Sequence, residues 1–213
     1  PPSSNLWSRA PILNPNETDA FHKYFESTAD AEDVFGELGY QLRTKMLELP
    51  TTRDDIGFLP ELQQRLLQTL ELVDLSSEMA RRETLIAPIL LEICTHTKQK
   101  LKIEYAINVS QQLRGSLDYF IPATQNLLVI EAKQADLSRG FVQLGAELIA
   151  LDQWTTSETP VLFGAITTGD TWKFGLLDRA QKTLLRDIRV YTVPSDLAAL
   201  VATLLAIIQG ASL

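Results

Sequence analysis

Two carboxylates and an amine stand close together near the middle of the chain. Asp118 lies in a predicted strand over 113–121, and Glu131 and Lys133 follow the β-favouring apolar run 127–130. Because side chains alternate along a strand, Glu131 and Lys133 are expected on one face. A buried run that ends in an acid and an amine indicates chemistry at the end of the strand.

The segment between the two strands reads Pro-Ala-Thr-Gln-Asn over 122–126, which is typical of a turn. A turn centred between Thr124 and Gln125 would place Asp118 directly opposite Glu131, with Cβ atoms about 4.5–5.5 Å apart. Like charges at that separation repel each other, and a divalent cation between them would relieve the repulsion.

The two carboxylates suit Mg²⁺, which binds hard oxygen atoms from one or two carboxylates together with water and substrate phosphate. Lys133 could orient or activate the attacking water, while the metal stabilises charge on the phosphate. The alternative interpretation is that Asp118 faces solvent, and that Glu131 and Lys133 form an exposed ion pair of little energetic weight.

The surrounding pattern predicts an α/β fold. Helical spacing is found over 17–27, 30–39, 60–73, 76–96, 136–154 and 196–208, and β patterns are found over 40–46, 101–109, 113–121, 127–130, 160–167, 171–177 and 184–193. This order predicts a mixed central sheet with helices on both faces. The last helix, capped by Ser195, is apolar nearly all round and is expected against the sheet or at an interface.

The helix predicted over 76–96 takes Ser76 as its N-cap, which places Glu78 in the first turn, where the helix dipole favours a negative charge. Pro88 is expected to kink this helix because it removes a backbone hydrogen bond. We interpret Arg82 as a structural residue that pairs with a carboxylate.

The helix predicted over 136–154 carries a polar stripe. Arg139, Gln143 and Glu147 are spaced four residues apart and share one helix face. Two interpretations remain open at this point, a solvated helix face and a set of side chains that supports the candidate site. In the hairpin that follows, Trp172 is expected in the core.

We divide the chain into an N-terminal arm and helical extension, 1–75, and a second domain, 76–213. The first 16 residues hold four prolines among Ser and Asn, which predicts an extended arm. The apolar stripe of the helix over 60–73 is expected against the core or a second subunit. A homodimer through the N-terminal helices or the C-terminal helix is therefore one expectation.

The chain has 213 residues and a formal net charge of −8, which argues against tight, non-specific DNA binding by charge alone. The charge leaves room for a nucleic-acid enzyme with a local basic face, a bound metal or a basic partner. Two histidines and one cysteine, Cys94, argue against a zinc site or a disulfide framework, and favour a cytoplasmic location. No apolar run is long enough to span a bilayer, so no membrane partner is expected.

Four ordered stretches between 76 and 178 together resemble the PD-(D/E)XK nuclease superfamily, whose fold is restriction-endonuclease-like. The residues in these stretches are most similar to those of the N-terminal nuclease domain of type I restriction enzyme R subunits and their stand-alone relatives. The four stretches are Glu78 with Arg82 and the run 85–90, Asp118 in SLDY, Glu131-Ala132-Lys133, and Gln143 with Glu147. The hairpin with Thr168-Gly169 and Trp172-Lys173-Phe174 resembles a further motif of this family.

The resemblance implies a metal-dependent nuclease that acts on DNA. The ligands of Mg²⁺ or Mn²⁺ would be two carboxylates and one backbone carbonyl, those of Asp118, Glu131 and Ala132. Lys133 would position or activate the water, and Glu78 would approach the metal directly or through water. Gln143 would support Lys133 or a phosphate.

The match has departures. Leu117 stands where the superfamily name has proline, and Thr168 stands where the family often has asparagine. The sequence has no helicase motif and no Gly-rich phosphate loop, so the resemblance does not extend to a complete R subunit. The alternative function is a catalytically inert, nuclease-like module that binds nucleic acid or a partner protein. The complete set of Asp118, Glu131 and Lys133 favours the enzyme, and the absence of a basic stripe favours the inert module.

Overall fold

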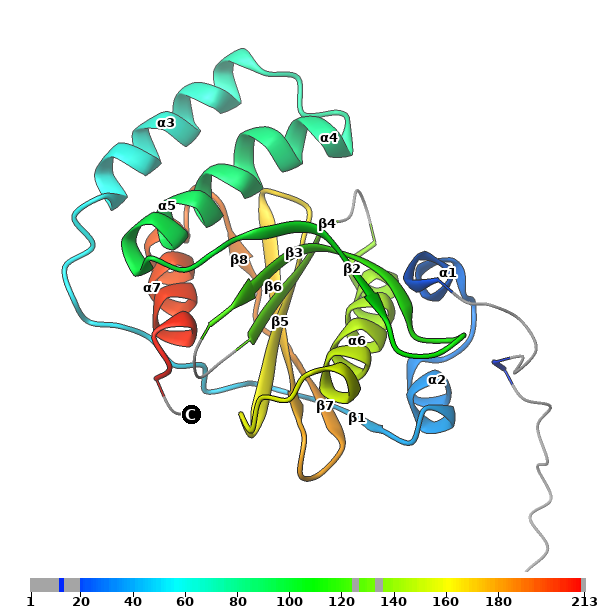
Figure 1. The fold of residues 1–213 in the computed structure, drawn as a ribbon. Coiled ribbons are helices and arrows are strands. Elements are labelled where there is room, and N and C mark those ends of the chain that lie inside the picture. Colours follow the sequence, from blue (N-terminus) through cyan, green and yellow to red (C-terminus); the bar gives the residue numbers. More distant parts are fainter. Residues whose placement is uncertain (1–11, 14–19, 124–126, 133–135, 212–213) are drawn as a thin grey trace, which may run out of the picture.

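The computed structural model describes residues 12–13, 20–123, 127–132 and 136–211, with backbone only for 127–132. Within these residues the chain forms a mixed α/β structure around one sheet with strand order β1-β7-β6-β5-β4-β3-β2, and β8 pairs with β6 (Figure 1). The strands are β1 (Gln41–Lys45), β2 (Lys102–Asn108), β3 (Arg114–Pro122), β4 (Leu127–Ala132), β5 (Val161–Thr167), β6 (Thr171–Asp178), β7 (Thr183–Asp187) and β8 (Tyr191–Thr192).

The sheet combines two antiparallel units with two parallel contacts. Strands β2, β3 and β4 are antiparallel in sequence, as are β5, β6 and β7. Strand β4 runs parallel to β5, and β1 runs parallel to β7. A parallel connection needs a crossover, and α6 (Leu137–Trp154) supplies it between β4 and β5. The predicted mixed sheet is therefore confirmed.

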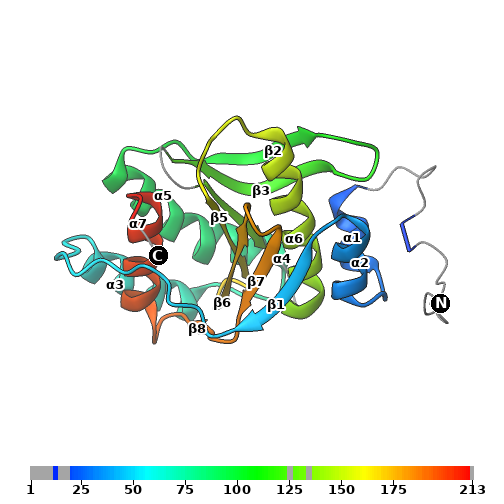
Figure 2. The same ribbon diagram turned by 90° about the horizontal axis from the view of Figure 1, so that it is seen from below.

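One face of the sheet is covered by α6, with α1 (Phe21–Glu26) and α2 (Ala31–Glu37) packed outside it (Figure 2). The apolar cluster on this face joins Phe35 of α2 and Phe141 of α6 to Ile166 of β5. Gly145 of α6 permits the close approach of α2, because a Cβ at that position would lie 2.3 Å from Cζ of Phe35.

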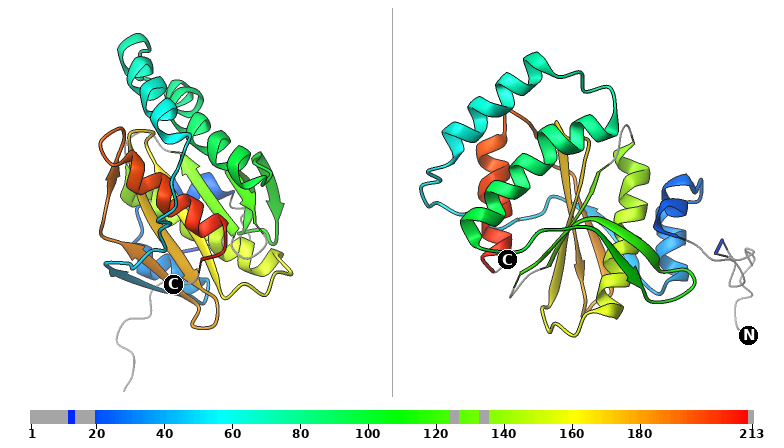
Figure 3. Two further views of the ribbon diagram at one scale, coloured as in Figure 1. Left: turned by 90° about the vertical axis from the view of Figure 1, so that its left-hand side faces the viewer. Right: turned by 45° about the horizontal axis from the view of Figure 1, so that its top comes forward.

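The opposite face is covered by α5 (Ala87–Thr97) and α7 (Leu197–Ile208), with α3 (Leu59–Leu72) packed on α5 (Figure 3). The core of this face includes Trp172, which is fully buried as predicted. Helix α7 buries nine of its twelve residues against the rest of the chain. This burial explains its apolar composition without a second subunit. The partly exposed Leu67 and Leu70 are on α3 instead.

The helix predicted over 76–96 is present in three parts: α4 (Glu78–Arg81), the π-helical turn η1 (Arg82–Ile86) and α5. The predicted N-cap was wrong by one residue, because the side chain of Ser77, not Ser76, accepts a hydrogen bond from the Ala80 N–H. Proline in a helix clashes with the carbonyl four residues earlier. The wide π turn ends two residues before Pro88, where its looser backbone can accommodate the proline ring, and the predicted kink stays a prediction.

Two further predictions needed correction near the C-terminus. The pattern over 184–193 forms two short strands, β7 and β8, because the chain leaves the sheet after Asp187. The N-cap position of α7 is Asp196, not Ser195, and the Asp196 carboxylate accepts hydrogen bonds from Thr192 instead of capping the helix. Gly210 follows the helix with φ of 82°, as expected of a C-terminal glycine.

The N-terminal extension is joined to the sheet through β1, which pairs with β7 in parallel. Asp30 caps α2 and Gly39 follows it with φ of 83°, both as predicted. Most of the predicted arm over 1–16 lies outside the described residues. No helix in the described part of the chain is long and apolar enough to cross a membrane.

Candidate functional site

The register of β3 on β4 brings the two candidate carboxylate positions to the same level of the sheet. Tyr119 pairs with Ile130, and the pairing continues without a break to Pro122 and Leu127. One further step of this register would place Asp118 opposite Glu131. Glu131 in turn pairs with Ile166 of β5, so the position lies at the carboxyl end of the parallel strands β4 and β5.

Two parts of the predicted site lie outside the described residues. These are the turn at 124–126 and the segment 133–135, which contains Lys133. For Glu131 and Ala132 the structure describes the backbone alone. The carbonyl of Ala132 lies at the end of β4, four residues before the N-cap residue Asp136 of α6. The predicted roles of Glu131, Ala132 and Lys133 therefore stay predictions.

Asp118 is held by a cation from the helical layer. Nη1 of Arg82 lies 3.6 Å from Oδ1 of Asp118, and Nη2 of Arg82 lies 2.6 Å from Oε1 of Glu104. The side chains of Arg82 and Asp118 are 16% and 14% exposed, so solvent screens their interaction only in part. The structural role proposed for Arg82 is confirmed, with two carboxylates as its partners.

The pKa values of this group follow from its packing. Burial lowers the pKa of Arg82, but hydrogen bonds with Tyr119 and Glu104 and the charge of Asp118 outweigh it, so the net pKa is raised. Burial raises the pKa of the Tyr119 hydroxyl despite the nearby guanidinium. Arg82 lies over the Tyr119 ring with its central carbon 5.3 Å from the centroid. Arg82 is therefore a fixed positive charge beside Asp118.

The regular alternation of side chains along β3 is broken at Asp118. Leu117 and Phe120 both pack in the cluster beneath α6, whereas Tyr119 packs in the cluster on the opposite face. Glu104, which the register would place opposite Asp118, has φ of 50° and is not paired with it. A local break of this kind can redirect a side chain out of the regular alternation, which fits the reach of Asp118 to Arg82.

Glu78 lies in the first turn of α4, one helical turn before Arg82. It is half-buried and is not among the described partners of Asp118. The β5–β6 turn packs against this helix, since a Cβ on Gly169 would lie 3.1 Å from Cβ of Arg81. Helix α4 therefore lies over the end of β5 and β6, and the predicted approach of Glu78 to a metal stays a prediction.

Gln143 and Glu147 are both buried, at 4% and 0% exposure, so the solvated-face interpretation is wrong for them. Nε2 of Gln143 donates a 2.9 Å hydrogen bond to Oε1 of Glu147. Arg139, the third member of the predicted stripe, is exposed and pairs with Asp136 at 3.6 Å. A polar pair held inside the α6 layer is compatible with a supporting role at the end of β4, because burial of polar groups without such a role is costly.

The β5–β6 turn is stabilised by its own side chains. Thr167 is fully buried, and its hydroxyl donates to the carbonyl of Thr171 and accepts from the Gly169 N–H, both at 2.9 Å. Nε1 of Trp172 donates to the Gly169 carbonyl at 3.0 Å. Gly169 has φ of 97°, a region that favours glycine. Thr168, the residue that departs from the family motif, also takes part in the turn, because its hydroxyl donates to Oδ1 of Asp170 at 2.7 Å and its N–H donates to the Thr171 carbonyl at 3.0 Å.

Two basic residues near the site were missed by the sequence reasoning. Lys173 pairs with Ile166, which is the other neighbour of Glu131, and Arg186 pairs with Gly175. Lys173 stood in the hairpin motif, but its proximity to Glu131 depends on pairing across three strands. In the sequence, Lys173 stands between the apolar residues Trp172 and Phe174. Because side chains alternate along a strand, this was the one available signal that Lys173 faces away from the core that holds those two residues.

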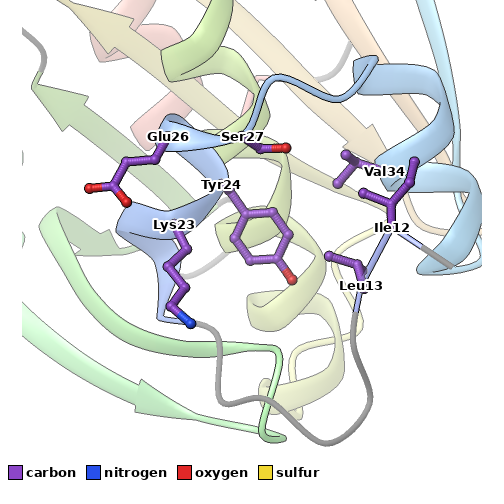
Figure 4. Close-up of a pocket in the computed structure, with 7 residues that line it drawn as sticks. All are labelled: Ile12, Leu13, Lys23, Tyr24, Glu26, Ser27 and Val34. Carbon is purple, nitrogen blue, oxygen red and sulfur yellow. The ribbon is translucent and has the colours of Figure 1, made fainter.

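The described cavities lie elsewhere. One of about 270 Å³ lies between α1, α2 and the segment 12–13, where Tyr24 and Val34 face Ile12 and Leu13 (Figure 4). The Glu37 carboxylate accepts hydrogen bonds from the backbone N–H groups of Ile12 and Leu13 at 2.6 and 2.8 Å. This contact holds the segment against α2, away from the sheet end with Asp118.

Among the residues whose side chains are described, no group of three His, Cys, Asp or Glu residues is arranged to hold a metal ion. Cys94 has a free thiol and is buried in the core. No protein-family model matches the chain, and no curated protein matches it either.

Proposed function

We propose that the chain is a metal-dependent nuclease that hydrolyses phosphodiester bonds of DNA on a restriction-endonuclease-like fold. The observation that carries this proposal is the β3–β4 register, in which Tyr119 pairs with Ile130. Continued by one residue, this register would set Asp118 opposite Glu131. Support comes from the position of this pair at the carboxyl end of two parallel strands, next to the crossover helix, where α/β proteins commonly bind their ligands.

The donor set fits a hard divalent cation. Asp118, Glu131 and the carbonyl of Ala132 would hold Mg²⁺ or Mn²⁺ through oxygen atoms alone, which is the ligand type that both ions prefer. A bound ion would neutralise charge on the phosphate and make water a better nucleophile. Asp118 would share its carboxylate between the ion and Arg82.

The side chains around this pair would position the reacting groups and influence the protonation of the attacking water. Lys133 would hold the attacking water by a hydrogen bond and favour its deprotonated form. Arg82 would keep Asp118 in one orientation through the 3.6 Å ion pair. The buried Gln143–Glu147 pair would support Lys133 or a phosphate from α6. Each group acts before the chemical step, so preorganisation is their shared contribution.

One observation favours a second candidate function, an inert module with the same fold that binds nucleic acid or a partner protein. Arg82 offsets the half-buried charge of Asp118 from within the protein. In an inert scaffold Asp118 would still need a cationic partner, because burial of an unpaired carboxylate costs folding free energy.

Plasmid cleavage in Mg²⁺ or Mn²⁺ distinguishes the two functions. The wild type is compared with Asp118→Ala and Lys133→Ala, and with Asp55→Ala and Lys182→Ala as charge-matched controls at exposed positions. The nuclease proposal predicts cleavage by the wild type and both controls, and loss of cleavage in both site variants with folding intact. Absence of cleavage by a folded wild type supports the inert module.

A further inference from the structure

Lys173 and Arg186 form a pair of cations on the face of the sheet that α6 covers. Gly175, two residues after Lys173, faces α6, because a Cβ there would lie 2.5 Å from Cε2 of Phe141. Lys173 points the same way by strand alternation, and Trp172 and Phe174 point into the opposite core. Arg186 pairs with Gly175, and its guanidinium lies 5.5 Å from the centroid of the Phe141 ring.

The two cations are diagonal neighbours on adjacent strands. The β6–β7 register pairs Gly175 with Arg186, so Lys173 lies one diagonal step from Arg186, a Cα separation of about 7–8 Å. Both side chains are half-buried. Burial lowers the pKa of Lys173, and the positive charge of Arg186 lowers it further. The pair is therefore an unfavourable arrangement of like charges unless an anion offsets it.

No described carboxylate forms an ion pair with Lys173 or Arg186. Asp187 is the nearby acid that attracts Lys173, and it is fully buried in other contacts. Its carboxylate accepts hydrogen bonds from the N–H groups of Leu47 and Arg189, both at 3.1 Å. The one described contact of Arg186 with a polar side chain is a 3.2 Å hydrogen bond to the Thr44 hydroxyl, which carries no charge.

This cation pair lies on the same level of the sheet as the candidate carboxylates. Glu131 pairs with Ile166, and Ile166 pairs with Lys173. Neighbouring strands are about 4.8 Å apart, so the backbone of Lys173 lies about 10 Å from that of Glu131. DNA advances about 3.4 Å per nucleotide along its axis, so this distance corresponds to a few nucleotides of one strand.

We infer that Lys173 and Arg186 together bind a backbone phosphate of the DNA substrate, a few nucleotides from the bond that is cleaved. The inference rests on the proposed function for its choice of ligand. It also answers the objection raised by the net charge of −8, because a local cation pair gives the acidic chain a place to hold a phosphate.

The test is the salt dependence of binding to a fluorescent DNA duplex, measured by anisotropy without a divalent metal so that no cleavage occurs. The double variant Lys173→Met/Arg186→Gln keeps the aliphatic stems and removes both charges. The control Lys100→Met/Lys182→Met removes two charges from exposed positions at the opposite end of the sheet. Loss of one phosphate contact lowers the slope of log affinity against log salt by about 0.9.

We expect the slope of log affinity against log salt to fall in the double variant Lys173→Met/Arg186→Gln and not in the control. We also expect the double variant to bind the duplex more weakly than the wild type at low salt. The charge-conserving variant Lys173→Arg/Arg186→Lys should keep the wild-type slope, and the single variant Lys173→Met provides a second reading if the double variant unfolds. An unchanged slope in a folded site variant, an equal loss in the control, or a wild type that does not bind the duplex would overturn the inference. Binding with the predicted slope change but without cleavage by the wild type would sustain it while the nuclease proposal fails.

Discussion

Arg82 and Asp118 form an ion pair with 3.6 Å between Nη1 and Oδ1, and this pair links the helical layer to the strand with the candidate metal ligand. Arg82 is the first residue of the π-helical turn, and Pro88 lies just after that turn. The widened turn therefore determines where the guanidinium enters the site. A change at Arg82 should affect metal binding and stability in opposite directions.

The variant Arg82→Gln is expected to bind Mn²⁺ more tightly and to unfold more easily. Removing a positive charge beside Asp118 favours a divalent cation by about 1 kcal/mol, roughly fivefold in affinity. Loss of the hydrogen bond to Glu104 and of the ion pair with Asp118 should cost about 1–3 kcal/mol of unfolding free energy. Calorimetric titration and urea unfolding measure the two effects.

Arg65→Gln is the matched control for this variant. Its ion pair with Glu92, at 2.7 Å, is more exposed and lies on α3 and α5. This change should cost less than about 1 kcal/mol and leave metal affinity unchanged. Weaker Mn²⁺ binding by a folded Arg82→Gln variant would contradict this expectation, and would mean that the orientation of Asp118 by Arg82 outweighs the repulsion between the guanidinium and the metal ion.

Glu147→Ala is expected to destabilise the protein by about 1–3 kcal/mol, because it removes the described acceptor of the buried Gln143 amide. Glu158→Ala, at an exposed position beyond α6, should change stability by less than about 0.5 kcal/mol. Urea unfolding with an unchanged m-value gives both figures. Equal effects of the two variants would mean that the Gln143–Glu147 pair contributes nothing measurable.

Gly169→Ala tests the β5–β6 turn. A Cβ at this position meets Cβ of Arg81 at 3.1 Å and Cδ1 of Leu85 at 3.2 Å, and the φ of 97° is strained for alanine. We expect a loss of about 1–3 kcal/mol. Gly57→Ala, in open space, is the control. A thermal melting point that falls no further for Gly169→Ala than for the control would show that the turn adapts freely.

The buried thiol of Cys94 is expected to reduce the unfolding free energy at alkaline pH. Burial raises the pKa of its thiol from 9.0 to about 11, so between these values the unfolded chain releases a proton that the folded chain keeps. Its contribution is therefore present below pH 9 and is lost as pH rises toward 11. Urea unfolding across this range should show a shallower decline for Cys94→Ala than for the wild type. Parallel declines would contradict the assignment.

Local residue types were sufficient to predict the hairpin. The β-favouring run before Glu131 and the turn-forming residues after Pro122 favour one pairing, and the observed register of Tyr119 with Ile130 is the pairing they predict. The α/β class followed for the same reason, since each element repeats a strong apolar period.

The burial of Gln143 and Glu147 could not be read from the sequence. Spacing of four places residues on one helix face but does not say whether that face meets water or the sheet. Helix α6 is covered by the sheet, α1 and α2, so its polar stripe divides, with Arg139 exposed and the other two buried. That outcome depends on contacts between segments far apart in the chain.

The interruption of the β2–β3 pairing at Glu104 could not be predicted from the sequence, for a different reason. Residues 101–109 alternate cleanly, which predicts a regular strand, yet Glu104 has φ of 50° and Ile103 is 54% exposed. The carboxylates of Glu104 and Asp118 both pair with Arg82, and this tertiary contact stabilises a backbone conformation that local preference disfavours. The position of Lys173 near Glu131 likewise needs the full strand order.

Calorimetric titration of Mn²⁺ into the wild type and Asp118→Asn tests the central claim most directly. Asparagine keeps the shape of aspartate and removes the charge that a divalent cation needs. We predict saturable binding by the wild type and at least a tenfold loss of affinity, about 1.4 kcal/mol, in the folded variant. Absence of binding by the wild type, or equal affinity of the two proteins, would contradict a metal site at Asp118 and Glu131.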